Sequence, residues 1–292
     1  TVVSFVFLVV VLSVFLLAVI LLSFFIGSVF ISPGELLKSD IFWKIRLPRV
    51  ILSALVGLLL SLSGVVLQGI LRNPLADPYV LGISAGGAVG AAISMVLGAS
   101  FTVLGMSSVP AAAFVFSLVA VYFVYKLSQV GGRASPETLI LSGVALSALC
   151  SAVLSLIIIL TGNLQAIYFW LLGSLSSASW GNVITVLPYV ITGTAITYYF
   201  SKELNALLMG EEMALTLGIN VEKTRLILIG TASLMSAAAV SVSGLIGFVG
   251  LVVPHWIRIL IGPNHRYLIP VSALSAMLLM VVADTLARTV LS

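Results

Sequence analysis

Apolar runs recur along this chain, and they constrain its fold more than any other feature of the sequence. A helix needs about 20 predominantly apolar residues to cross the hydrocarbon core of a bilayer, and the runs have that length. The chain is 61% hydrophobic and 8% charged, whereas soluble domains carry about 25% charged residues. No run shows the alternating pattern of an outer-membrane β-strand. The sequence predicts an all-α, polytopic transmembrane bundle forming one domain over residues 1–292.

The apolar runs predict nine spanning helices, and the charges between them predict a topology. The positive-inside rule favours a cytoplasmic N-terminus. Lys44, Arg46 and Arg49 then lie outside, against the usual bias, and an acidic partner arriving from outside would explain them. The predicted spans are 2–30, 49–71, 80–98, 108–127, 138–161, 183–201, 225–243, 246–261 and 268–290.

One long segment, residues 204–225, could not lie in lipid. It predicts a short helix over 211–217 that ends at Gly218, with two carboxylates in the first turn, where the helix dipole favours them. Its apolar side chains have no core of their own and need a partner surface. We expect this segment to pass force from a soluble motor to a membrane pathway. The apolar residues are Leu207, Leu208, Met209, Met213, Leu215 and Leu217.

Small residues at four-residue spacing predict close helix packing. Gly82, Gly86 and Gly90 follow this spacing in the third apolar run, and such residues allow helix backbones to approach closely. The second run carries a similar face, with small residues at Ser53, Gly57, Ser61 and Gly64.

Hydroxyl groups follow one face of the fifth apolar run. Such a stripe could line a water-filled route for a solute, or each hydroxyl could bond the carbonyl of the preceding turn. Both interpretations stay open. The face includes Ser142, Gly143, Ser147, Ser151 and Ser155.

Two other functions are compatible with single residues. Gly82 to Gly86 fits the G-x-S-x-G pattern, so Ser84 with His255 could form an intramembrane serine protease, although that motif needs a strand–turn–helix junction. Asp284 and His255 could instead relay protons in an ion-coupled secondary transporter, because intramembrane charges are usually functional. Asp284 and Arg288 are one turn apart and could pair locally.

Several site classes are not expected. The chain has no phosphate-binding loop and no HExxH motif, so no catalytic residue is predicted. Cys150 is the single cysteine, which excludes a disulfide framework. His255 has no second histidine or carboxylate at metal-ligand spacing, so no metal site is predicted. Basic residues are scattered over loops without aromatic interleaving, which argues against a nucleic-acid partner.

Ordered sequence blocks between about residues 31 and 288 resemble the FecCD-like permease subunits of ABC importers for iron–siderophore complexes, haem and cobalamin. The number and order of these blocks make the resemblance specific. They are RLPR at 46–49, SGVVLQGILRNPLADPYVLGISAGGAVG at 63–90, LSGVAL at 141–146, FWLLGSL at 169–175, LNALLMGEEMALTLGI at 204–219, GLIGFVGLVVPHWIRILIGPNHR at 244–266 and ADTLAR at 283–288.

The resemblance implies a fold and a set of partners. It implies ten transmembrane helices per subunit in the cytoplasmic membrane of a prokaryote, with the tenth helix absent from this chain. It implies a second permease subunit, either an identical copy or a related chain, and two cytoplasmic ATP-binding subunits that hold the ATP and Mg²⁺. An extracytoplasmic solute-binding protein would deliver the chelate. No cofactor is expected in the chain itself.

The resemblance also implies site residues. Arg46, Arg49 and Arg288 are the expected outer-face arginines that meet glutamates of the binding protein. The inner gate is expected over 135–138, where Ser135, Pro136 and Glu137 precede the fifth span, with Ser142, Ser147 and Ser151 along the pathway. Residues expected to couple the chain to the ATPase are Leu207, Met209, Glu211, Glu212, Met213, Leu217 and Gly218.

Overall fold

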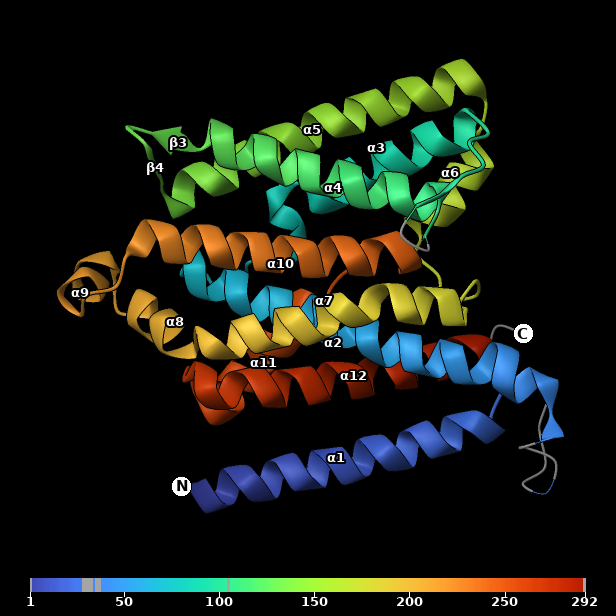
Figure 1. Cartoon of the computed structure of the whole chain (residues 1–292), viewed down its shortest axis with the longest axis horizontal. Coiled ribbons are helices and arrows are strands. Elements are labelled where there is room, and N and C mark those ends of the chain that lie inside the picture. Colours follow the sequence, from blue (N-terminus) through green and yellow to red (C-terminus); the bar gives the residue numbers. More distant parts are fainter. Residues whose placement is uncertain (1, 28–33, 35–37, 104–105, 291–292) are drawn as a thin grey trace.

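Long helices lie side by side along one direction, and a few short elements cover the two ends of the bundle (Figure 1). The computed structural model describes residues 2–27, 34, 38–103 and 106–290. The long helices are α1 (Val2–Phe25), α2 (Leu47–Ile70), α3 (Ile83–Val96), α4 (Ser108–Leu127), α5 (Pro136–Thr161), α7 (Trp180–Tyr199), α10 (Val221–Ser243), α11 (Val249–Ile261) and α12 (His265–Val290).

Short elements connect these helices. A π-helix (Phe42–Arg46) leads into α2, and a 3-10 helix (Pro78–Leu81) leads into α3. Two small antiparallel hairpins pair β1 (Thr102–Val103) with β2 (Met106–Ser107) and β3 (Gln129–Val130) with β4 (Arg133–Ala134). The short helices are α6 (Leu164–Leu171), α8 (Ser201–Leu208) and α9 (Glu211–Thr216).

The predicted spans correspond to helices of the structure. Six helices in the described part of the chain are long and apolar enough to cross a membrane, and α7 with α8 forms a further span bent by 54°. The shorter apolar helices α3 and α11 supply the remaining two predicted segments. The all-α prediction is therefore confirmed. The first span is shorter than predicted, because α1 ends at Phe25 and residues 28–30 lie outside the described part.

Helix α2 is the centre of the bundle. It packs against α12, α10, α11 and α7, and 83% of its most apolar window is buried inside the chain. By contrast, only 6% of the corresponding window of α1 or α5 is buried. The apolar side chains of α1 and α5 must therefore meet lipid or another protein, because water would not tolerate so large an apolar surface.

Glycines permit the close helix contacts that the sequence predicts. A Cβ added to Gly86 or Gly90 would collide with backbone carbonyl groups of α4, which confirms the tight-packing prediction for these two residues. Gly82 is different and corrects the prediction. It has a φ of +76° at the start of α3, and a Cβ there would meet only side chains at ordinary contact distance. Gly82 is needed for a left-handed turn rather than for close packing.

We expect Gly64→Ala to destabilise the bundle. A Cβ at this position of α2 would overlap the carbonyl oxygen of Gly250, and overpacking of this kind costs about 1–3 kcal/mol. Gly230→Ala is the matched control, since Gly230 is also inside a helix and nothing lies within 4 Å of its added Cβ. It should stabilise the protein by about 0.5–1 kcal/mol. Thermal unfolding in detergent measures both, and equal melting temperatures would contradict the packing assignment.

The two ends of the bundle carry different elements. The beginning of α1, the α8–α9 segment and the β3–β4 hairpin lie at one end, whereas the beginning of α2 and the end of α12 lie at the other (Figure 1). The predicted motor-facing segment and the predicted outer arginines are therefore at opposite ends, as the topology requires.

Candidate coupling and docking sites

The predicted motor-facing helix is present as α9, packed on a small apolar core. Ala206 and Leu207 of α8 meet Ala214 of α9 and Val221 of α10 in this core. Leu207 is only 3% exposed. This corrects the prediction that Leu207 contacts the ATPase, because a side chain buried inside the chain cannot meet a partner. Leu207 instead packs in the core between α8, α9 and α10.

Four large apolar side chains of this region remain exposed. Met209 is 69% exposed, Leu217 is 62% exposed, and Met213 and Leu215 are exposed as well. They lie in α9 or directly beside it, beyond the end of the bundle. Side chains that face water at such a place are normally polar. An exposed apolar patch of this kind marks an interaction site. We call these four residues the α9 surface.

Two glycines fix the ends of α9. Gly210 has a φ of +116° before the helix, and Gly218 has a φ of +78° after it. The amide of Gly218 donates to Leu215, and the amide of Ile219 donates to Ala214 at 3.1 Å. These bonds satisfy the last carbonyls of the helix. The predicted stop at Gly218 is confirmed, and the helix covers 211–216 of the predicted 211–217.

Arg225 joins α9 to two other segments. Its side chain is 2% exposed and forms ion pairs with Glu211 of α9 and with Glu222 of its own helix. The Nη1 group also donates a 2.6 Å hydrogen bond to the carbonyl oxygen of Ala134 in β4. We call this set the Arg225 node. The sequence places Arg225 only where the 204–225 segment meets the next predicted span, so these contacts were not predicted.

The predicted gate residues lie beside α9. Ser135 is the N-cap of α5, and its hydroxyl accepts from the amide of Thr138 at 3.2 Å in a capping box. Pro136 takes the first helical position, where a missing N–H is harmless. A groove of about 720 Å³ runs between this helix start and α9. It is lined by Arg72, Ser135, Pro136, Glu137, Met209, Gly210, Glu211, Glu212, Met213 and Thr216.

The hydroxyls of α5 bond their own helix. Ser151 donates to the carbonyl of Ser147 at 2.8 Å, and Ser155 donates to that of Ser151 at 2.9 Å. Ser151 is nevertheless exposed, whereas Ser142 and Ser147 are half-buried. Self-satisfied hydroxyls allow this face to meet either lipid or another subunit without an unpaired polar group. Ser151 and Ser155 thus bond the carbonyl of the preceding turn, as the second interpretation of the stripe expects.

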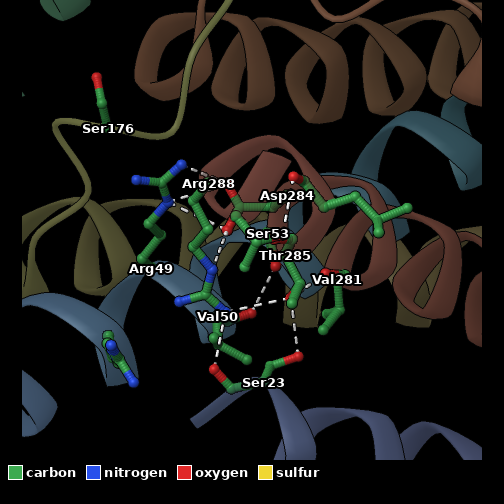
Figure 2. Close-up of polar contacts among 12 residues, drawn as sticks. Ser23, Arg49, Val50, Ser53, Ser176, Val281, Asp284, Thr285 and Arg288 are labelled. Atoms are coloured by element: carbon green, nitrogen blue, oxygen red, sulfur yellow. Dashed lines mark hydrogen bonds and ion pairs between the residues drawn. The ribbon is translucent and has the colours of Figure 1, made fainter. Parts of the chain in front are cut away.

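At the other end, Asp284 of α12 organises two of the predicted outer arginines. Arg49 forms a bidentate pair with its carboxylate, with Nη2 donating to Oδ1 at 2.8 Å and Nε donating to Oδ2 at 3.1 Å. Arg288 lies one turn further along α12, 3.7 Å from Oδ2, which confirms the predicted local pair. Figure 2 shows the Arg49 guanidinium directed toward Asp284, whereas Arg288 also reaches Ser23, to whose carbonyl oxygen its Nη2 donates at 2.8 Å. The bidentate pair fixes the orientation of Arg49 as well as attracting it.

Arg46 does not fit the prediction of an exposed docking group. It is 5% exposed, and its Nη1 donates to the carbonyl oxygens of Phe24 and Phe25 at the end of α1. These carbonyls belong to the last turn of a helix and have no partner within it. Arg46 is thus a helix cap that fixes α1 against the start of α2. The side chain of Arg288 is only 9% exposed and donates to the carbonyl oxygen of Ser23 at 2.8 Å, whereas that of Arg49 is 19% exposed, so Arg49 is the most accessible of the three arginines to an outside partner.

The residues of the two alternative functions are not brought together. Ser84 lies half-buried in the first turn of α3, and His255 lies in α11. In the part of the chain that the structure describes, no hydrogen bond joins Ser84 to His255, and Asp284 is bound by arginines. The protease and proton-relay interpretations therefore find no support in the geometry.

Comparison with known proteins decides the family. The model of the FecCD transport family matches residues 15–292. The chain belongs to the FecCD transport family. The match confirms, over nearly the whole chain, the resemblance to FecCD-like permeases that the sequence blocks indicate. The helical architecture described above is the fold of these permeases.

Similar proteins cover several cargoes. The chain is 46% identical over 245 residues to the cobalamin import permease BtuC of Halobacterium salinarum, covering 84% of this chain and 65% of that protein. It is 39% identical over 261 residues to the hemin transport permease HmuU of Yersinia pestis, covering 87% and 78% respectively. The chain thus spans about two thirds of the halobacterial protein.

A solved structure described as an inward-facing metal-chelate-type ABC transporter has a similar fold. The TM-score is 0.86 at 31% identity, and the match covers 97% of this chain and 90% of that one.

Proposed function

We propose that the chain is the permease subunit of an ATP-driven importer that moves a metal chelate of the cobalamin, haem, siderophore or ferric citrate class. The family match and the relatives for these cargoes support this proposal. The α9 surface is the observation that carries it. An apolar surface on a helix outside the bundle has no use in a self-sufficient transporter, but it suits a chain that is moved by a separate ATPase.

The partners follow from the surfaces that the chain leaves uncovered. Two cytoplasmic ATPase subunits, which would hold ATP and Mg²⁺, are proposed to contact the α9 surfaces of two permease subunits. The exposed face of α5 is proposed to meet the second permease, identical or related, across the solute pathway. A loaded binding protein would dock at the opposite end, where Arg49 is partly exposed beside Arg288.

This arrangement implies an orientation in the cytoplasmic membrane of a prokaryote. The α9 end lies in the cytosol together with the beginning of α1, and the Asp284 end faces outward. The positive-inside rule supports this orientation. The chain itself performs no covalent chemistry. It converts movement of α9 into alternating access of the pathway, with the gate at the start of α5. A tenth helix remains a prediction from the family.

Reconstitution tests the proposal. The complete complex in liposomes should take up cyanocobalamin, haemin or ferric citrate only with ATP inside and the binding protein outside. Vanadate, which traps ATPases, should stop uptake, whereas a protonophore should not. Uptake by the permease alone, or uptake that a protonophore abolishes, would contradict the proposal.

A further inference from the structure

We propose that Arg225 is a positioning residue that makes α9 and the β3–β4 hairpin move as one body, so that a push on α9 reaches the gate at the start of α5. This inference rests on the proposed coupling role of α9. It adds a named mechanical link to that role, which neither the family nor the relatives' names supply.

The contacts of Arg225 define the link. One guanidinium reaches three segments: α9 through Glu211, α10 through Glu222 at 3.1 Å, and β4 through the Ala134 carbonyl at 2.6 Å. Glu211 is 14 residues and Ala134 is 91 residues from Arg225 along the chain. Such a three-way contact links elements that are far apart in the sequence.

The hairpin contact leads directly to the gate. Ala134 immediately precedes Ser135, whose side chain caps α5 and fixes the direction in which this helix begins. A displacement of the Ala134 carbonyl must therefore displace the N-cap and the first turn of α5. The path from the α9 surface to the start of α5 runs through two side chains, those of Glu211 and Arg225.

The apolar contacts of α9 reach the hairpin only indirectly, because Ala134 belongs to a buried cluster that includes Leu204 of α8 and Leu228 of α10 but no residue of α9. Among the described elements, α9 packs on α8 and on α10, and its core of small apolar residues includes no residue of the hairpin or of α5. The remaining space between α9 and the start of α5 is the open groove described above. Arg225 is accordingly the polar bridge at the base of that groove.

Burial makes the bridge stiff. The Arg225 side chain is 2% exposed, whereas those of Glu211 and Glu222 are 37% and 36% exposed, so these ion pairs are partly shielded from water and are screened less than a fully exposed pair. A buried charge that loses a partner is strongly unfavourable, so Arg225 does not easily release Glu211. Exposed ion pairs on this chain, such as Lys44 with Asp40, lack this property.

The test uses the assembled complex in nanodiscs, with Arg225→Gln as the variant. Spin labels at Thr216→Cys in α9 and Val130→Cys in β3, both exposed sites, report the distance between the two elements. Cys150, the one native cysteine, is replaced by alanine. We expect one narrow distance distribution in the wild type, kept between nucleotide-free and vanadate-trapped states. Arg225→Gln should broaden the distribution.

Transport supplies a second readout. The substrate is whichever of cyanocobalamin, haemin and ferric citrate the wild-type complex takes up. Arg225→Gln should lower the amount of this substrate transported per ATP hydrolysed by about fivefold. This is within the range expected when a residue that carries coupling is changed. Binding of the ATPase subunits should persist, because the α9 surface is intact. Lys223→Gln removes an exposed charge two residues away and should leave both readouts at wild-type values.

A double-variant cycle separates this role from general stability. If Arg225 acts through Glu211, then Glu211→Ala alone, Arg225→Gln alone and the double variant should lower the transport ratio equally, because interacting residues are not additive. Glu211→Ala also serves where Arg225→Gln fails to assemble. Unchanged label distances, a normal transport ratio or strictly additive losses would overturn the inference. Absence of ATP-driven uptake by the wild type would instead refute the proposed function.

Discussion

A permease carrying Met213→Asp and Leu217→Asp is expected to bind its ATPase subunits about 100-fold or more weakly and to lose ATP-driven uptake. Both side chains are exposed in the isolated chain, so they are free to be covered by a partner. Covering an apolar side chain of this size contributes about 1.5–3 kcal/mol, and each 1.4 kcal/mol changes the dissociation constant about tenfold. The aspartates add the cost of burying a charge.

Titration of ATPase subunits onto permease in nanodiscs measures the affinity. The matched control is Leu75→Asp, which places one aspartate on a leucine that is 62% exposed in the segment after α2, outside α9. It should keep the wild-type affinity. Normal binding and uptake by the double variant would show that the ATPase contacts the permease elsewhere.

The sequence alone was sufficient to predict the bundle and the position of α9. Apolar runs of membrane length can hardly form anything but helices, because lipid leaves no other way to satisfy the backbone. Gly218 predicts the end of α9 in the same way, because a glycine readily adopts the left-handed conformation that ends a helix. Both predictions depend on local sequence, and Gly218 with its φ of +78° bears this out.

Predictions failed where the direction of a side chain depends on distant segments. Leu207 and Met209 are two residues apart in sequence, yet Leu207 is buried against α9 and α10 whereas Met209 is exposed. A short helix that is apolar on more than one side does not reveal which side the rest of the chain will cover. Spacing alone could not have separated the two.

The arginines illustrate the same limit. The Asp284–Arg288 pair was predicted because the residues are one helical turn apart, but the bidentate partner Arg49 is 235 residues away. The role of Arg46 as a cap of α1, and the contacts of Arg225, likewise depend on tertiary placement. Charge counts place an arginine at one end of a span and say nothing of its partner.

At the outer end, Arg49→Gln combined with Arg288→Gln and Asp284→Asn is expected to weaken docking of the loaded binding protein about 10- to 100-fold. The loss corresponds to about 1.4–2.7 kcal/mol, which is moderate for two charge-assisted contacts with carboxylates. Asp284→Asn is included because a buried carboxylate left without its arginines would destabilise the fold by itself. Arg46 stays intact, because it caps α1 and is buried.

Salt separates a docking role from a structural one. Wild-type affinity should fall as ionic strength rises, because the partner charges approach through water, and association should slow more than dissociation speeds up. The triple variant should have lost most of this salt dependence while keeping the wild-type melting temperature within a few degrees. Lys44→Gln is the control, since Lys44 is exposed at the same end and already paired with Asp40; it should change affinity by less than about twofold, as expected for an exposed charge. A triple variant that binds with wild-type affinity and an unchanged salt dependence would mean that Asp284, Arg49 and Arg288 serve only to hold α2 against α12.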